Sequence, residues 1–301
     1  MMINLLKKIL KNGEDMQVNK KISIGIIGAD TTHVSAFVEA LTLNPEYSQV
    51  FEVLGIYDDA LTQNSFFIQR KDAIKTKLKE LGFECTQDDS FLKKCDGLLI
   101  LTGDASVHLK LFKMYAHQNQ AVFIDKPATY DRASYQTMVD YATKHDIAMF
   151  SSSAMRFAQF VQKAKEQVQT HSSVVVRGPL SFIEGIPDYH WYGIHLLEML
   201  DEVVEGPLRI KSFSMSDTKE RIIFHDETKH LEIVGIKVGN PNFEVFVDDV
   251  SYELKDTLYV SLLKEITTFI QTKESPVKTT GKIMNLLEEI NLWKSEASKN
   301  D

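Results

Sequence analysis

The feature of this 301-residue chain that most restricts its fold is an alternation of short apolar runs with longer amphipathic stretches. The runs at 22–29, 51–57, 97–102, 121–124 and 147–150 are mostly apolar and bounded by turns, as expected of buried strands. Between them, 32–43, 60–81, 107–118 and 131–145 carry apolar residues at helical spacing. Strands that alternate with helices predict a doubly wound parallel sheet.

The pattern changes after about residue 155. A helix is expected at 157–169, and strand-like stretches then follow one another at 174–183, 209–216, 221–225, 231–238 and 244–250. Turn signals such as Gly239-Asn240-Pro241-Asn242 separate them, which indicates an antiparallel sheet. Helices at 257–272 and 281–294 close the chain. We therefore predict an N-terminal extension (1–20), a doubly wound α/β domain (21–150) and an α+β domain with a mostly antiparallel open sheet (151–301).

Composition excludes several classes of protein. The net charge is −8 and no basic stripe occurs, so nucleic acid is not expected as the main partner. The two cysteines, Cys85 and Cys95, form no CxxC or metal-ligand spacing, and free thiols favour a cytoplasmic protein. The apolar start of the chain is interrupted by Lys7 and Lys8, and no cleavage site follows. We thus expect neither a membrane span nor a secretory signal.

The turn after the first predicted strand is a candidate cofactor site. In a doubly wound sheet this turn holds phosphate groups, because free N–H groups and the helix dipole favour an anion there. The six residues that we expect to bind a cofactor are Gly28, Ala29, Asp30, Thr31, Thr32 and His33. Only Gly28 matches the usual glycine pattern, and Asp30 would repel a pyrophosphate unless it faced away, for example as a helix N-cap. A purely structural turn is the alternative.

Asp58, at the end of the second predicted strand, is a second candidate. A carboxylate at this position can accept hydrogen bonds from ribose hydroxyls and repels a 2′-phosphate. Asp59 follows it, and no Arg or Lys is adjacent in sequence. This favours NAD over NADP, with a solvated turn carboxylate as the alternative.

The run 98–127 resembles the Gfo/Idh/MocA family of nicotinamide-dependent oxidoreductases. In that family one strand ends near a Thr, a helix begins with a His, and the next strand ends in Glu-Lys-Pro. The matching residues are Thr102, His108 and Asp125-Lys126-Pro127, with Asp in place of Glu. The pair Arg156-Phe157 is similar to an Arg-Phe step of the family. The segment 191–195 is similar to its Asp-x-Gly-x-His segment, except that Trp191 stands at the position of the catalytic Asp and cannot exchange a proton.

This resemblance implies a Rossmann domain followed by a domain with a large open sheet, which commonly pairs with another copy. We therefore expect a homo-oligomer, a dimer or a tetramer. It also implies that Thr102, Asp125 and Lys126 contact the cofactor. Lys126 would polarise the substrate oxygen, with a pKa lowered by partial burial.

His195 is the expected proton carrier, since an imidazole serves as acid or base near neutral pH. Glu198, three residues later, is expected to orient the ring or raise its pKa. His190 and Tyr192 are expected near the substrate and could replace the missing Asp, and Trp191 could stack on a sugar. Arg156 would bind a substrate carboxylate or phosphate, or brace the domain junction.

No metal site is expected. His190 and His195 are five residues apart, a spacing that does not place both rings on one helix face. The leading hypothesis is an NAD(P)-dependent oxidoreductase that transfers a hydride between a nicotinamide and a sugar, polyol or related hydroxy compound. The alternatives are a dinucleotide-binding sensor or accessory protein without turnover, and an NAD-dependent lyase or glycosidase.

Overall fold

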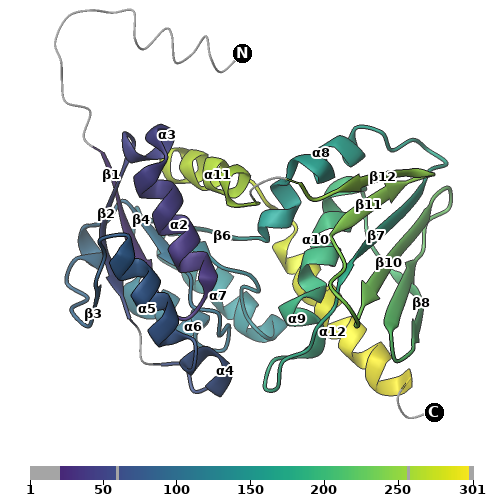
Figure 1. Ribbon diagram of the computed structural model, residues 1–301, viewed down its shortest axis with the longest axis horizontal. Helices are drawn as coiled ribbons and strands as arrows, with labels where there is room; N and C mark the ends of the chain where they lie inside the picture. Colours follow the sequence, from purple (N-terminus) through teal and green to yellow (C-terminus); the bar gives the residue numbers. More distant parts are fainter. Residues whose placement is uncertain (1–20, 59–60, 256–257, 298–301) are drawn as a thin grey trace, which may run out of the picture.

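The computed structural model describes residues 21–58, 61–255 and 258–297. The predicted extension at 1–20 and Asp59 lie outside the described residues. Two sheets stand side by side, each with helices packed against it (Figure 1). The predicted fold class, a doubly wound parallel sheet followed by an α+β unit with a mostly antiparallel sheet, is confirmed.

The first sheet has six strands, all parallel, in the order β3-β2-β1-β4-β5-β6. Its strands are β1 (Ile22–Ile27), β2 (Phe51–Tyr57), β3 (Cys85–Thr86), β4 (Gly97–Ile100), β5 (Ala121–Ile124) and β6 (Ala148–Ser151). Every residue of β4 and β5 is buried, because helices cover both faces of the sheet. The strand order reverses between β1 and β4, which makes their carboxyl ends the topological switch point.

The helices of this half follow the predicted pattern closely. They are α2 (Thr32–Leu43), α3 (Pro45–Ser48), α4 (Ser65–Ile68), α5 (Lys71–Glu80), η1 (Leu92–Lys94), α6 (His108–Tyr115) and α7 (Arg132–Lys144). In α2 the residues Val34, Phe37, Val38 and Leu41 are buried, which is the face that the spacing predicts.

One helix prediction in this half is wrong. The single helix expected at 60–81 is instead α4 followed by α5. The side chain of Asn64 accepts the backbone N–H of Phe66 and so begins a new short helix at this point. Neither β3 nor η1 was predicted, because elements of two or three residues show no periodicity.

The second sheet has the order β12-β11-β7-β10-β9-β8. Its strands are β7 (Ser173–Pro179), β8 (Ile210–Met215), β9 (Lys219–Phe224), β10 (His230–Ile236), β11 (Glu244–Val247) and β12 (Val250–Glu253). β7 and β10 pair in parallel, and the other neighbours are antiparallel. The strand predicted at 244–250 is in fact a hairpin, because Asp248 takes a left-handed φ of 54° and turns the chain between β11 and β12.

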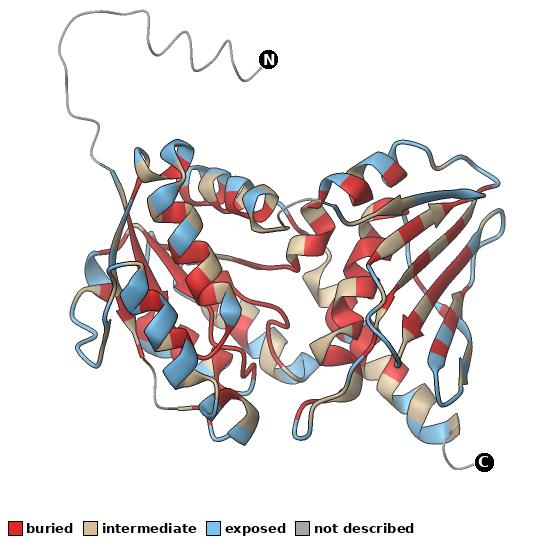
Figure 2. Ribbon diagram, in the orientation of Figure 1, coloured by how far each residue is buried: buried red, intermediate tan, exposed pale blue. Residues whose placement is uncertain are grey.

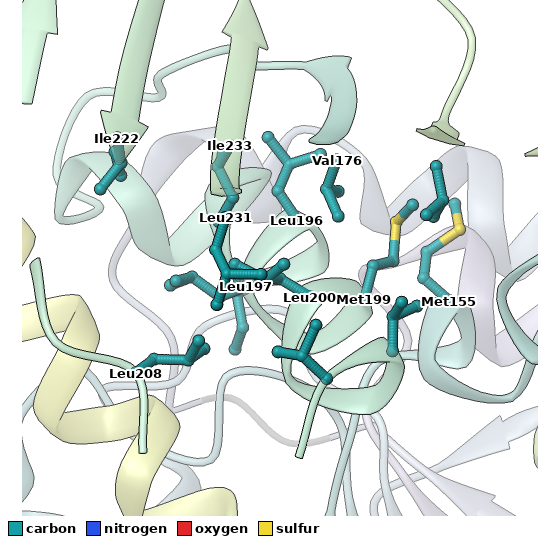
Figure 3. Packing of buried hydrophobic residues seen from close by; sticks show 14 of the residues in the cluster. Met155, Val176, Leu196, Leu197, Met199, Leu200, Leu208, Ile222, Leu231 and Ile233 are labelled. Atoms are coloured by element: carbon teal, nitrogen blue, oxygen red, sulfur yellow. The ribbon is translucent and has the colours of Figure 1, made fainter. Parts of the chain in front are cut away.

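The core of the second half lies between this sheet and the helices on one of its faces. These are η2 (Ala154–Phe157), α8 (Gln159–Lys165), α9 (Asp188–Trp191), α10 (Gly193–Val203) and α12 (Thr280–Ala297). Leu196, Leu197 and Leu200 of α10 pack against Leu231 and Ile233 of β10 (Figure 3). Burial in both halves is concentrated between helices and sheets (Figure 2).

Helix α11 (Leu258–Thr272) departs from the predicted domain division. Its apolar face, with Leu262, Ile266 and Phe269, belongs to the core cluster that includes Ile24 of β1 and Phe37 of α2. The chain therefore returns to the first sheet after β12 and then crosses back to the second core in α12. The described residues of 151–301 therefore pack in both cores, and the domain boundaries stay a prediction. Among the described helices, none has the length and apolarity to cross a bilayer.

Candidate active site

A cavity of about 400 Å³ lies where the first sheet's loops face α10 and its preceding turn. Several of the predicted residues line it, namely Thr31, Thr32, His33, Asp125, Lys126, Trp191, Tyr192 and His195. The loop after β1, the first turn of α2 and the loop after β5 supply the first five, and the segment around α9 and α10 supplies the rest. The structure thus brings together residues that are up to about 160 positions apart in the sequence.

Lys126 is buried at this carboxyl edge of the sheet and is 5% exposed. Its Nζ lies 3.4 Å from the carbonyl oxygen of Trp191 and 4.8 Å from the centroid of the Trp191 ring. Burial lowers the pKa of Lys126, while the neighbouring Asp125 carboxylate acts in the opposite direction. The direction of the shift is the one that the sequence predicts.

Asp125 and His33 form a close pair at the wall of the cavity. Nδ1 of His33 lies 2.6 Å from Oδ2 of Asp125. Burial alone would raise the pKa of Asp125, but His33 and Lys126 hold it below its ordinary value. Asp125 is therefore ionised and balances the charge of Lys126 inside the cavity.

His195 reaches the cavity from α10, and Nδ1 of its ring lies 2.6 Å from Oγ of Ser153. Burial, together with the positive charges of Lys126 and His33, holds the pKa of His195 well below its ordinary value. The imidazole is consequently neutral near pH 7. Ser153, which sequence reasoning missed, also accepts the backbone N–H of Met155 and is thereby fixed in place.

The expected partnership between His195 and Glu198 is wrong. The Glu198 carboxylate accepts hydrogen bonds from Oγ of Ser152 at 2.5 Å, from the N–H of Ser153 at 3.0 Å and from Nε of Arg156 at 3.0 Å. Residues three positions apart are neighbours on a helix surface, but the Glu198 carboxylate bonds to Arg156, because a charge-assisted hydrogen bond is stronger than one to a neutral imidazole.

Arg156 is held inside the protein by three carboxylates. It is 4% exposed, and its Nη2 and Nη1 lie 2.8 Å from Asp201 and 3.2 Å from Glu202, in addition to the bond to Glu198. Burial would lower the pKa of Arg156, but Glu198 and Asp201 raise it. These contacts connect η2 to α10, and the binding of a substrate by Arg156 stays a prediction that its burial does not favour.

His190, which the sequence places near the substrate, does not line the cavity. Its side chain is fully buried, lies outside the cavity lining and packs edge-on to the Tyr130 ring at 5.9 Å. Burial lowers the pKa of His190 to about 4. Adjacent residues of a short helix point in different directions, so Trp191 and Tyr192 face the cavity while His190 does not.

The residues of the loop after β1 have two kinds of position, because Gly28, Ala29 and Asp30 pack inside the protein and Thr31 lines the cavity. Gly28 has a φ of 112°, and a β-carbon there would lie 2.5 Å from the backbone N of Thr102, so only glycine fits. Asp30 is fully buried and accepts bonds from Oγ1 of Thr102 at 2.6 Å and from the N–H of Gly103 at 2.9 Å. Asp30 is therefore not a helix N-cap, which is Thr31.

Two further residues predicted to contact the cofactor are buried inside the protein. Ala29 and Thr102 are fully buried, and neither these two nor Gly28 and Asp30 line the cavity. These residues tie the loop after β1 to the loop after β4. Thr31, Thr32 and His33 do line the cavity, although the hydroxyl of Thr31 donates to the carbonyl of Leu101 at 3.1 Å.

Asp58 also differs from expectation. Its carboxylate lies 2.9 Å from Nζ of Lys71 and 2.6 Å from Nζ of Lys75, and it is 7% exposed. Burial would raise the pKa of Asp58, but the two lysines hold it below its ordinary value. The absence of lysine next to Asp58 in sequence was misleading, because α5 brings two lysines to it in space.

Several lining residues escaped sequence analysis, among them Phe66, Arg70 and Tyr259. The guanidinium carbon of Arg70 lies 4.9 Å from the centroid of the Phe66 ring. Phe66 and Arg70 lie in the range 60–81, where the sequence predicts one long helix. Tyr259 lies in α11, the helix that returns to the first sheet. No local periodicity identifies any of them.

Comparison with protein-family models and with curated protein sequences finds no match. Solved structures do match. A probable dehydrogenase from Thermotoga maritima superposes with a TM-score of 0.70 at 16% identity, covering 93% of this chain and 98% of that one. A Gfo/Idh/MocA family oxidoreductase from Vibrio cholerae gives 0.67 at 13% identity, covering 91% and 100%.

The WlbA (WbpB) dehydrogenase from Thermus thermophilus, in complex with NAD and alpha-ketoglutarate, gives a TM-score of 0.67 at 10% identity, covering 90% of this chain and 94% of that one. These likenesses extend over nearly the whole chain in each case. With its parallel sheet, its mixed open sheet and the cavity between them, this chain has the fold of the Gfo/Idh/MocA-type dehydrogenases.

Proposed function

We propose that this protein is an oxidoreductase that transfers a hydride between a nicotinamide cofactor and a hydroxyl group of a sugar, polyol or related compound. The observation that carries the proposal is the cavity in which buried Lys126, from the end of β5, and neutral His195, from α10, face one space. The names of structures with this fold, several of them dehydrogenases and one in complex with NAD, support it. NAD is the proposed cofactor, with NADP as the second choice.

The described residues fit a dinucleotide only in part. The side with Thr32, Asp125 and Lys126 is open to the cavity and suits the nicotinamide end, which would supply the acceptor for a hydride. The side toward Asp58 does not fit, because this carboxylate is already paired with two lysines and the Phe67 ring packs on Gly103 next to Thr31. No step of the following mechanism therefore depends on the geometry of a bound cofactor.

The chain's own groups can bind and deprotonate an alcohol. Lys126 would donate a hydrogen bond to the substrate oxygen and stabilise the charge that develops there. His195 would accept the hydroxyl proton at Nε2, because Nδ1 is held by Ser153. When the Ser153 hydroxyl accepts a hydrogen bond from Nδ1, Nε2 carries no hydrogen and can take up a proton. When Ser153 donates to Nδ1, Nε2 carries the hydrogen and can donate it.

The substrate that we propose carries an acidic group. Arg70 lines the cavity and has no carboxylate partner among the ion pairs of residues 21–58, 61–255 and 258–297. Asp125, the carboxylate of the cavity lining, is already paired with His33. A carboxylate or phosphate on the substrate would pair with the planar guanidinium of Arg70. Trp191 and Tyr192 offer rings on which a sugar can stack.

The test is an assay of neutral and acidic sugars and polyols with NAD⁺ and NADP⁺, on the wild type, on Lys126→Met and on Lys93→Met. We expect Lys126→Met to lower kcat/KM by a factor of about 10² or more, since a positioned proton donor contributes about that much. Lys93 is an exposed residue of η1, and its variant should retain the wild-type rate. The proposal fails if no substrate is oxidised by the wild type, or if Lys126→Met is as active as the wild type.

A second candidate is a dinucleotide-binding protein without turnover. Two observations favour it: Trp191 holds the position of the family's acid–base Asp, and Asp30 replaces a glycine in the loop after β1. In that case calorimetry would detect cofactor binding while the whole substrate panel stayed inert. Oxidation that depends on Lys126 would exclude this candidate.

A further inference from the structure

The carboxyl ends of β1 and β4 form the crevice at the switch point of the first sheet. In open α/β sheets, ligands bind outside the strands at such a point: the pyrophosphate lies at the turn after the first strand, a carboxylate near the end of the second strand bonds to the adenosine ribose, and the loop after the fourth strand forms the other wall of the crevice. In this chain those positions are the loop with Thr31, the end of β2 with Asp58, and the loop with Gly103 and Asp104.

Residues 61–70, here called the strap, lie across this crevice, in contact with Gly103 and Asp104. Phe67 is fully buried. A β-carbon built on Gly103 would lie 2.3 Å from Cε1 of Phe67 and 2.6 Å from Cγ2 of Thr31. The Phe67 ring therefore packs directly on the bare backbone of Gly103, beside Thr31, and takes up part of the space next to a cavity that Gly103 and Thr31 also line.

A hydrogen bond fastens the strap at its first turn. Oγ1 of Thr62 donates to Oδ2 of Asp104 at 2.6 Å, and Thr62 is 4% exposed. Asp104 in turn accepts bonds from Oγ and the N–H of Ser106, so its carboxylate is oriented by its own loop. Because this bond is shielded from water and involves a charged acceptor, it is stronger than an exposed neutral one.

The strap also contacts the second half of the molecule. Nδ2 of Asn64 donates to the carbonyl of Glu184 at 3.2 Å. The rings of Phe66 and Phe67 lie 5.4 and 5.8 Å from the ring of Trp191, both edge-on. Figure 1 shows α4 at the edge of the first half that faces the loop leading to α9. The strap thus contacts both halves of the molecule at the wall of the cavity.

We propose that the strap and the adenosine half of a dinucleotide compete for the switch-point crevice, and that Phe67 and Thr62 are the residues that determine dinucleotide affinity. The dinucleotide binds only to molecules in which the strap has left Gly103. The observed dissociation constant is therefore the intrinsic dissociation constant divided by the fraction of molecules in which the crevice is open. That the competitor is a dinucleotide rests on the function proposed above. The contacts of the strap in the crevice do not depend on that function.

The experiment compares NADH binding by four full-length chains: the wild type, Thr62→Val, Phe67→Ala and Thr279→Val. The last is a matched control, since the Thr279 hydroxyl donates to Asp201 at 2.5 Å, another threonine–aspartate bond but remote from the crevice. Calorimetry measures the dissociation constant. In a Trp293→Phe background, the fluorescence of Trp191 reports the departure of Phe66 and Phe67.

We expect Thr62→Val and Phe67→Ala each to bind NADH at least tenfold more tightly than the wild type, and Thr279→Val to match the wild type. Amides of the strap should exchange hydrogen faster when NADH saturates the wild type. Thr62→Val removes one hydroxyl and no packing volume, so it remains informative even if Phe67→Ala fails to fold.

Two results overturn the proposal: equal or weaker NADH binding by Thr62→Val and by folded Phe67→Ala, or NADH saturation of the wild type with the strap amides fully protected. Tighter binding without oxidation of any substrate supports the strap and contradicts the oxidoreductase. If the wild type oxidises a substrate rapidly while the strap amides stay protected, the oxidoreductase is supported and the strap proposal is contradicted. If none of the four chains binds NADH, both proposals fail.

Discussion

At the scale of single residues, burial decides the chemical state of the groups that sequence analysis singled out. Lys126 and His195 both have pKa values lowered by burial, which suits a pair that shares protons with an alcohol. Arg156 and His190 are as buried as Lys126, but the first is held by three carboxylates and the second lies outside the cavity. Their chemical type was evident from the sequence, whereas their surroundings were not.

His190 provides a prediction at this scale. Its pKa is about 4 in the folded chain, below the ordinary value of 6.5, so the unfolded chain binds the extra proton between these two pH values. The contribution of His190 to stability is therefore complete above pH 6.5 and is lost as the pH falls toward 4.

We expect the loss of melting temperature between pH 7 and pH 4.5 to be smaller in His190→Phe than in the wild type. His225→Phe, at an exposed position, should behave like the wild type. Thermal unfolding followed by circular dichroism at several pH values measures this difference. An identical pH dependence of all three chains would show that His190 is not buried in its neutral form.

At the scale of elements, the junction of η2 and α10 determines how the second half meets the first sheet. Arg156 of η2 bonds to Glu198, Asp201 and Glu202, all on α10, and Thr279 and Lys282 also reach Asp201. This cluster connects the end of the first sheet, α10 and the start of α12. Ser153, which positions His195, donates its backbone N–H to Glu198, so the bond from Arg156 to Glu198 also holds Ser153 in place.

Removing the arginine should leave buried carboxylates without a counter-charge. We expect Arg156→Met to lower the free energy of unfolding by about 3–5 kcal/mol, the usual cost of breaking a buried ion pair. Lys165→Met removes a more exposed partner of the same Glu202 and should cost less than about 1 kcal/mol. Urea unfolding measures both values, and equal losses in the two variants would contradict the assignment of Arg156 as a brace.

At the scale of the whole molecule, the site depends on two packed units that exchange segments. Helix α11 returns to the first core and α12 to the second, so the polypeptide crosses between the units more than once. The cavity is lined from both units, and its width is consequently set by how they pack. The helices cover one face of the second sheet, and Figure 1 shows the other face without a helix layer.

That uncovered face leads to the prediction of a homo-oligomer. It carries partly exposed apolar side chains, such as Val175, Val234 and Phe246, among paired charges such as Arg177 and Glu244. An apolar sheet face of this kind is usually covered by a second copy. We expect a dimer or tetramer in sedimentation experiments and a shift toward monomer in Phe246→Glu. A wild-type chain that sediments as a monomer at high concentration would contradict this.

The sequence by itself determined the fold class, because alternating buried strands and helices, followed by strand after strand, are recorded in local periodicity. It also placed Lys126 and His195, since a strand-end motif and a helix-start motif are local signals. Only the tertiary structure decided which partners these and other groups have. Asp58 is neutralised by Lys71 and Lys75, Glu198 is taken by Arg156, and Phe67 occupies the space above Gly103. Pairing and occupancy depend on contacts between distant segments, and such contacts leave no periodic trace in the residues that make them.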